Sequence, residues 1–274
     1  MGFGSGFGVN FTASTRFASS GGGATDLTTW SSRPLINNSD GDLGTGPNGS
    51  TYRWSSVLGE WIQSWIHDLG GTFVLKGKLD GDNDPSAETP AWTESTPAGS
   101  GTSTTDGTHV LINTTAAVSD KQYIDLSHGV TGGKYLMCGN LTVSGVAGTG
   151  AKLRFNIHTG GYRPNIDIAG ANFSNNAVLT TSAAPPAEVG NRISATTLAT
   201  EKWVELYVIA GTTPSTFLNQ GSHRVFSYID HVLRGVADLD EFTSSTSTVF
   251  RIGDADSAVS ALIKIRNLKA GTWA

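Results

Sequence analysis

Short apolar runs alternate with clusters of turn residues along most of the chain, from Thr72 to the end. In residues 152–157 and 262–266, apolar and polar side chains follow each other with a period of two, which is typical of strands that bury one face. A long series of such strands without crossover helices cannot build a parallel sheet. The pattern therefore predicts an all-β fold, a two-sheet antiparallel jelly-roll sandwich over residues 72–274.

Residues 53–71 follow a different period. Their apolar side chains recur at the spacing of one helical stripe: Val57, Leu58, Trp61, Ile62, Trp65, Ile66 and Leu69. Ser55 or Ser56 can cap the first turn, and the Gly70-Gly71 pair can end the helix in the left-handed conformation. We therefore predict one short amphipathic helix over residues 53–71, packed on the body of the protein or on a neighbouring subunit.

Residues 1–52 show neither period. They are rich in Gly, Ser and Asn and carry isolated phenylalanines. A segment of this composition buries too little apolar surface to offset the entropy of ordering it, which predicts an extended arm. A floppy tail is one interpretation; the other is that the phenylalanines fill pockets on a partner surface.

Composition and charge restrict the kinds of partner that the protein can be expected to bind. The chain has 274 residues, 38% of them hydrophobic and 15% charged, and a net charge of -5 without long acidic or basic runs. No Lys/Arg-rich stretch favours nucleic acid as a ligand, and no apolar run is long enough for a membrane helix. The start of the sequence shows no secretory signal pattern, so we expect synthesis in a cytoplasm. Cys138 stands alone, which excludes a disulfide within the chain.

Four segments of the second half carry a family resemblance: EKWVELYVIAG, HRVFSYIDHVLRG, VFRIGD and ALIKIRNLKAG. This series resembles the strands of concanavalin A-like lectin/glucanase jelly rolls, the laminin-G type included, and the resemblance covers about residues 72–274. One departure is His231, which stands where that family usually turns on Gly after "YID". The resemblance implies a jelly roll of a kind that includes lectins, glycoside hydrolases and polysaccharide lyases.

Residues 1–71 resemble the Gly/Phe-rich virion-anchoring ends of tailed-phage structural proteins. The leading hypothesis is accordingly a non-enzymatic virion structural protein, a capsid decoration, fibre or tail-associated protein that binds other virion proteins and forms a homo-oligomer. Its anchor would consist of apolar side chains from the arm and the helix, because aromatic anchors tend to dominate interface energies. These residues are Phe3, Phe7, Phe11, Trp54, Trp61, Ile62, Trp65 and Ile66.

The first alternative is a glycan-binding module for host attachment. Such a site needs an exposed aromatic ring that stacks on a sugar, with amide or acid groups nearby. The sequence offers Trp92, and Tyr162 with Arg163, as candidates.

The second alternative is a polysaccharide lyase or glycoside hydrolase. Retaining glycosidases need two carboxyl groups about 5–5.5 Å apart. Glu201 and Glu205, and the run from Asp238 to Glu241, are the nearest approach to such a pair, and we interpret them as solvated acids. Lyase patterns of the R-x-E-x-R and Q-x-H kind are missing, so no catalytic residue is predicted.

A metal or cofactor is not expected. The six histidines lack the spacing of a metal motif. Asp80, Asp82 and Asp84 are spaced like calcium ligands, but Pro85 stands where the loop requires Gly. A calcium ion near these three acids is the remaining alternative.

Overall fold

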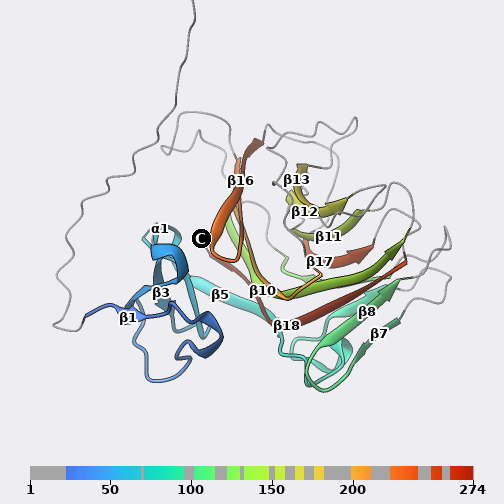
Figure 1. The fold of residues 1–274 in the computed structure, drawn as a ribbon, viewed down its shortest axis with the longest axis horizontal. Coiled ribbons are helices and arrows are strands. Elements are labelled where there is room, and N and C mark those ends of the chain that lie inside the picture. The colour runs from blue at the N-terminus through green and yellow to red at the C-terminus, as the bar shows by residue number, and fades with distance from the viewer. Residues whose placement is uncertain are drawn as a thin grey trace, which may run out of the picture.

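The computed structural model describes residues 23–68, 71–95, 102–114, 122–129, 133–147, 152–157, 164–169, 176–181, 199–210, 223–239, 248–254 and 260–273. They form an eight-stranded sheet, a six-stranded sheet and a smaller four-stranded sheet near the N-terminus. None of the helices in these ranges is long and apolar enough to cross a membrane. Figure 1 shows the two larger sheets as stacked layers, with the small sheet beside them.

The eight-stranded sheet is built around two long neighbours, β10 (Gly133–Ala147) and β18 (Ser260–Trp273), which pair antiparallel. The sheet order is β16-β15-β14-β10-β18-β8-β7, with β5 also paired to β18. The other strands are β5 (Phe73–Leu79), β7 (Thr102–Thr105), β8 (Val110–Thr114), β14 (Lys202–Ala210), β15 (His223–Ile229) and β16 (Val232–Leu239).

The six-stranded sheet has the order β13-β12-β11-β17-β9-β6, and all its pairs are antiparallel. Its strands are β6 (Thr93–Ser95), β9 (Tyr123–Ser127), β11 (Lys152–Ile157), β12 (Pro164–Ala169), β13 (Asn176–Thr181) and β17 (Val249–Asp254). A short helical turn, η3 (Pro85–Ala87), precedes β6.

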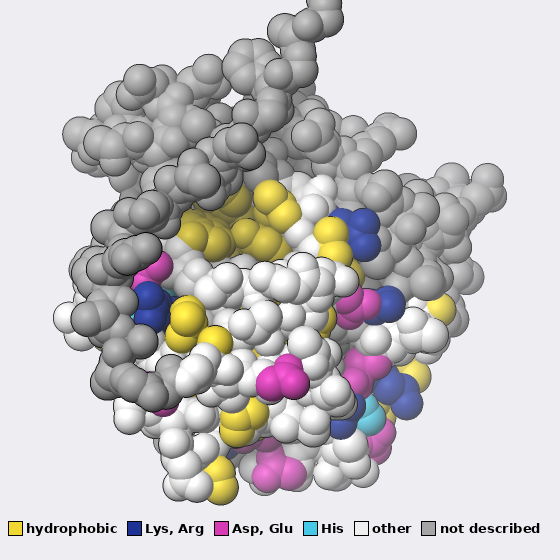
Figure 2. Space-filling model, turned by 60° about the vertical axis from the view of Figure 1, so that its left-hand side comes forward, with side chains coloured by type: hydrophobic (Ala, Val, Ile, Leu, Met, Phe, Trp, Pro, Cys, Tyr) yellow, Lys and Arg dark blue, Asp and Glu magenta, His cyan; other side chains and the backbone are white. Residues whose placement is uncertain are grey.

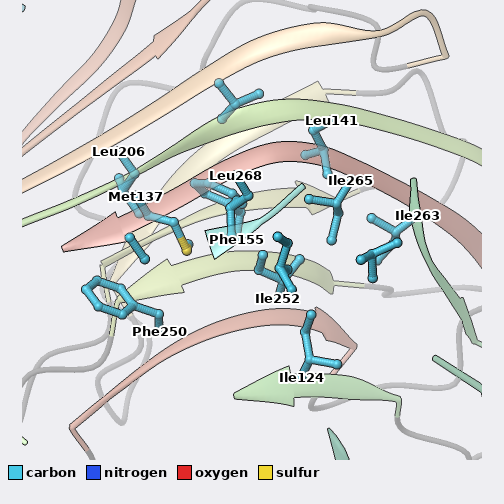
Figure 3. Packing of buried hydrophobic residues seen from close by; sticks show 14 of the residues in the cluster. Ile124, Met137, Leu141, Phe155, Leu206, Phe250, Ile252, Ile263, Ile265 and Leu268 are labelled. Atoms are coloured by element: carbon cyan, nitrogen blue, oxygen red, sulfur yellow. The ribbon is translucent and has the colours of Figure 1, made fainter. Parts of the chain in front are cut away.

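The main core lies between these two sheets. Met137 on β10 and Ile265 on β18 face Phe155 on β11 and Ile252 on β17, and all four are buried. Figure 3 shows these side chains pointing into the space between the sheets. Each fully buried aliphatic or aromatic side chain contributes about 1.5–3 kcal/mol. The predicted all-β, antiparallel jelly-roll sandwich is confirmed.

Residues 23–68 form a separate small layer, which we call the N-terminal module. It contains β1 (Thr25–Asp26), η1 (Trp30–Ser32), β2 (Leu43–Thr45), η2 (Pro47–Gly49), β3 (Thr51–Ser55), β4 (Glu60–Gln63) and α1 (Ser64–His67). Strand β1 pairs parallel with β2, and β2, β3 and β4 pair antiparallel. Figure 1 shows the module lying against one end of the eight-stranded sheet, close to β16, β5 and the C-terminus.

The predicted amphipathic helix over residues 53–71 is wrong. Most of this segment is the hairpin of β3 and β4, in which Trp54 and Trp61 are cross-strand partners, and only the four residues of α1 are helical. Gly59, with φ +58, turns the chain between the strands, a conformation that favours glycine and that a helix does not use. The two tryptophans are seven residues apart, so two facing strand positions imitate the spacing of a helical stripe.

The predicted extended arm over residues 1–52 is wrong for residues 23–52, which carry two strands and two helical turns. The ordering of this segment is explained by Leu27 and Trp30, which are buried against the rest of the chain, and their burial offsets the entropy of ordering. Residues 1–22, with Phe3, Phe7 and Phe11, lie outside the described residues.

The apolar anchor predicted from the tryptophans is also corrected. Trp54, Trp61, Ile62 and Ile66 are at most 4% exposed, and they belong to the chain's own second core cluster. Trp65 packs partly buried against the same cluster. These side chains are covered by their own chain and do not form a surface for a neighbour.

His231, which departs from the family pattern, forms a two-residue hairpin turn with Asp230. Ile229 pairs with Val232 across this turn, and both turn residues have positive φ, +47 for Asp230 and +67 for His231. Such turns match the twist of a hairpin. Asp230 is fixed by its carboxylate, which accepts from the backbone N–H of Trp203 at 3.1 Å and pairs with Lys202 at 2.5 Å.

Candidate functional site on the outer face of the eight-stranded sheet

The outer face of the eight-stranded sheet is the face turned away from the main core. Because side chains alternate along a strand, Val204, Leu206 and Val208 of β14 enter the main core, whereas Trp203, Glu205 and Tyr207 point to the outer face. The N-terminal module covers one part of this face, which we call the covered half. The part around Arg266 of β18 and Glu201, which precedes β14, lies beyond the module, and we call it the open half.

Glu205 lies at the centre of the covered half and is 1% exposed. Its Oε1 atom accepts from Tyr52 Oη at 3.0 Å, from Trp203 Nε1 at 3.0 Å and from Gln63 Nε2 at 3.4 Å. Its Oε2 atom accepts from the hydroxyl of Tyr207. Two of these donors come from the module and two from the sheet, so the carboxyl group joins the two layers.

The pKa of Glu205 is raised to about 7 because burial removes the carboxyl group from water, and the four hydrogen bonds oppose that effect only in part. His231 lies beside it, with Nδ1 at 2.6 Å from Tyr52 Oη and 3.7 Å from Glu205 Oε1. Burial lowers the pKa of His231 to about 4. The imidazole is therefore neutral near pH 7, and Glu205 changes its charge there.

A buried ion pair inside the module lies next to this network. Arg33 Nη2 lies 2.6 Å from Glu60 Oε2, and Arg33 Nε donates to Glu60 Oε1 at 2.7 Å. The guanidinium carbon lies 4.7 Å from the ring centroids of both Trp30 and Trp203, a cation–π arrangement. Lys269 of the sheet donates to the carbonyl oxygen of Gly59 at 2.6 Å. The stacking of Arg33 on Trp203 and the hydrogen bond from Lys269 to Gly59 thus link the module to the sheet.

The open half carries a second polar group, which we call the Glu201 array. Arg266 donates to Glu201 Oε2 through Nε at 2.7 Å and to Oε1 through Nη2 at 2.5 Å. Asn140 Nδ2 donates to Oε1 at 3.0 Å, and its own Oδ1 accepts from Asn267 Nδ2 at 3.3 Å. The hydrogen bonds from Arg266 lower the pKa of Glu201. Partial burial raises this pKa, but by less, so the net shift is downward. The carboxylate is therefore ionised and held rigidly.

His109 extends the Glu201 array towards β8. Its Nε2 atom lies 3.6 Å from Glu201 Oε2, and its Nδ1 atom lies 3.5 Å from Asp106 Oδ1. Asp106 accepts the backbone N–H groups of Thr108 and His109 at 2.9 and 2.8 Å, which lowers its pKa. The His109, Glu201 and Arg266 side chains are 22–38% exposed, so a ligand in solvent can reach them.

Glu201 and Glu205, weighed from the sequence as a possible acid pair, have separate environments. Residues four apart along an extended strand are separated by roughly 13 Å, well beyond the spacing of a retaining pair. One carboxyl is buried under the module, and the other is paired with Arg266 on the open half. The interpretation of both as solvated acids is wrong for Glu205. The alternation of two acids with aromatic residues in "EKWVELY" was the signal in the sequence that these acids share a face with aromatic side chains. The hydrogen-bond partners of the two acids are distant in sequence, so the sequence did not reveal their environments.

The other predicted site residues lie elsewhere. Trp92 is 1% exposed and donates from Nε1 to the carbonyl oxygen of Lys78 at 3.0 Å, so its prediction as a sugar-stacking ring is wrong. Tyr162 and Arg163 lie outside the described residues. Asp80 pairs with Lys78, and the described residues contain no group of three or more His, Cys, Asp or Glu that could hold a metal ion.

The topology defines the class of protein: a two-sheet antiparallel jelly-roll sandwich, with an N-terminal module added to the outer face of one sheet. No family model matches the chain, and no curated protein matches it in sequence.

Solved structures with a similar fold include proteins whose names concern carbohydrates. The alginate lyase Aly36B is 12% identical, with 73% of this chain and 96% of that chain covered and a TM-score of 0.44. Domain 4 of the arabinanase AbnA from Geobacillus stearothermophilus, solved with arabinotriose, is 13% identical, with 73% and 92% covered and a TM-score of 0.47. The carbohydrate recognition domain of Emp47p is 11% identical, with 72% and 98% covered and a TM-score of 0.44.

The prediction that the protein is not an enzyme is corrected by these comparisons. Alginate lyases are among the similar structures, as is an endo-β-1,4-glucuronan lyase from Trichoderma reesei, at 10% identity and a TM-score of 0.44. At such identities the likeness concerns the fold alone. The fold is thus one that enzymes also use, and it gives no reason to exclude catalysis.

Proposed function

We propose that the protein binds carbohydrate on the open half of the outer face. The observation that carries this proposal is the Glu201 array, in which Arg266 and Asn140 hold one carboxylate in a fixed orientation at the solvent boundary. Binding sites fix the orientation of their ligands with a few well-placed polar groups. Carboxylate, amide and guanidinium groups that are held before the ligand arrives bind hydroxyl groups with little loss of side-chain entropy.

The test is binding of purified protein to a panel of neutral and acidic glycans, followed by isothermal titration with the best ligand. Glu201→Gln and Asn140→Ala should each weaken binding about tenfold, or about 1.4 kcal/mol. Asp82→Asn, an exposed acid in the turn after β5, is the matched control and should bind as the unmodified protein does. No binding across the panel, or unchanged affinity in both array variants, would refute the proposal.

Cleavage of a polysaccharide is the second candidate function. It is favoured by the imidazole of His109, which lies 3.6 Å from Glu201 Oε2 on an accessible face, because histidine is the side chain that most often serves as a general acid or base in enzymes. Incubation with a polysaccharide panel should release shorter products, and His109→Gln should reduce the rate by about 10²-fold or more. If no polysaccharide is cleaved, or if His109→Gln cleaves at an unchanged rate, this function is excluded.

Attachment to a virion through other virion proteins, as a homo-oligomer, is a proposal that now rests on residues 1–22. Because Trp54 and Trp61 are buried in the module, the remaining candidate anchors are Phe3, Phe7 and Phe11. Mass spectrometry of purified particles should find the full chain but not a chain that lacks residues 1–22. Equal incorporation of both chains, or absence of both, would remove this proposal.

A further inference from the structure

A pocket of about 320 Å³ opens where the N-terminal module meets the beginning of β5 and the end of β18. We call it the seam pocket. Two parts of the chain far apart in sequence form it: the module contributes Asp40, Val57 and His67, and the jelly roll contributes Thr72, Phe73 and Trp273. The pocket is separate from the open half, because roughly 23 Å of extended strand lies between Trp273 and Arg266.

One side of the seam pocket is apolar. Phe73 and Trp273 lie together there, with ring centroids 5.2 Å apart. Trp273 is 5% exposed, whereas Phe73 is partly exposed, and Val57 is 48% exposed. Ile62 and Ile66 complete this side from the module. The surface therefore suits a ligand with an apolar ring face.

The other side of the seam pocket is polar. Asp40 Oδ1 accepts from the backbone N–H of Ser56 at 2.8 Å and from Ser56 Oγ at 3.0 Å. Its second oxygen, Oδ2, lies 3.7 Å from His67 Nε2. Partial burial raises the pKa of Asp40, but the bonds from Ser56 and the neighbouring His67 more than offset it, so the pKa is lowered. An ionised acceptor and an imidazole thus face the apolar side.

We propose that the seam pocket binds a single hydroxylated six-membered ring, a pyranose unit of a sugar. The apolar face of such a ring packs on Phe73 and Val57, and adjacent hydroxyl groups donate to Asp40 and accept from His67. The pocket volume of about 320 Å³ is that of about ten water molecules at liquid density, which is large enough to admit one pyranose ring with its hydroxyl groups. This proposal uses none of the residues of the Glu201 array and holds whether or not the open half binds glycans.

The experiment is saturation-transfer NMR of the full chain with glucose, galactose, mannose, N-acetylglucosamine and glucuronic acid, followed by titration. A single ring should bind weakly, with a Kd on the order of 1 mM. Asp40→Asn should weaken binding at least tenfold, and Thr72→Trp, which fills the entrance, should abolish it. Val57→Trp is a second filling variant that serves if Thr72→Trp fails to fold. Asp82→Asn should change nothing.

Three results would overturn the proposal. The first is the absence of binding to any of the five sugars. The second is wild-type affinity in both Asp40→Asn and a folded filling variant. The third is tighter binding of cyclohexylamine than of every sugar, which would mean that Asp40 selects a cation. Glu201→Gln separates the two sites: it should weaken glycan binding on the open half and leave the seam pocket unchanged.

Discussion

Glu205 gives the sharpest prediction, because the substitution Glu205→Gln removes a buried titrating group and keeps its shape. The folded-state pKa is raised from 4.5 to about 7. A carboxyl group with a raised pKa stabilises the folded state most when it is protonated in both states, below pH 4.5. That contribution is lost as the pH rises from about 4.5 to about 7, and no further change follows above pH 8.

The magnitude follows from the shift. Each pKa unit corresponds to about 1.4 kcal/mol, so the shift from 4.5 to about 7 corresponds to about 3 kcal/mol of unfolding free energy. Glutamine can still accept at the oxygen that faces Tyr52, Trp203 and Gln63. We therefore expect the unfolding free energy of Glu205→Gln to be lower than or similar to that of the wild type near pH 4.5. Between pH 4.5 and 8, the difference between the two proteins should shift by about 2–3 kcal/mol in favour of the variant.

The assay is urea unfolding at several pH values between 4.5 and 8, with the free energy of unfolding compared between the two proteins. Glu201→Gln is the control. Its carboxyl group has a pKa lowered from 4.5, so its effect on stability is lost only as the pH falls below about 4.5, and the stability curve of Glu201→Gln should run parallel to that of the wild type from about pH 5.5 to 8. If the stability curves of wild type and Glu205→Gln run parallel between pH 4.5 and 8, the buried carboxyl group does not titrate as proposed.

Three further predictions concern how the module is held. Because the pKa of His231 is lowered to about 4, this residue stabilises the fold fully above pH 6.5 and progressively less as the pH falls towards 4. His231→Asn, in which asparagine tolerates the positive φ, should reduce the loss of unfolding free energy between pH 6.5 and 4. An unchanged loss in this range would contradict the prediction. Trp61→Ala should lower the unfolding free energy by about 3–5 kcal/mol in urea unfolding. The control Ile36→Ala, at a side chain 74% exposed, should change it by no more than about 0.5 kcal/mol. Equal effects would mean that the module does not contribute to the core. Arg33→Met should cost about 3 kcal/mol in urea unfolding, because Glu60 stays buried and loses both hydrogen bonds from Arg33, keeping the longer 3.6 Å contact with Lys269 as an ion pair. Adding Glu60→Leu should recover part of that loss. Additive losses in this double-mutant cycle would show that the two residues do not interact.

The sequence was sufficient to predict the jelly roll, because the pattern that indicates its strands lies within each strand. In residues 152–157 and 262–266 the alternation of apolar and polar side chains assigns one face to the core, and this holds whichever strand lies next to them. The same alternation in "KWVELYV" indicates that Trp203, Glu205 and Tyr207 share a face. It does not indicate that this face is covered.

The secondary structure of the N-terminal module depends on tertiary contacts. Trp54 and Trp61 are compatible with a helical stripe and with a hairpin, because seven residues make two helical turns and also join facing positions across a short loop. The hairpin is favoured because β2 pairs with β3 and because the outer face of the sheet buries both indoles. Propensity over so short a segment is weak compared with burial of this size.

The candidate sites depend on the same distinction. The partners of Glu205 come from residues 52, 63, 203 and 207, and the seam pocket joins residue 40 to residue 273. The sequence determined which side chains can ionise, donate or stack, because those are properties of each residue. Only the folded chain decided which of them meet and which lose contact with water, because proximity and desolvation arise from contacts between segments that the sequence keeps far apart.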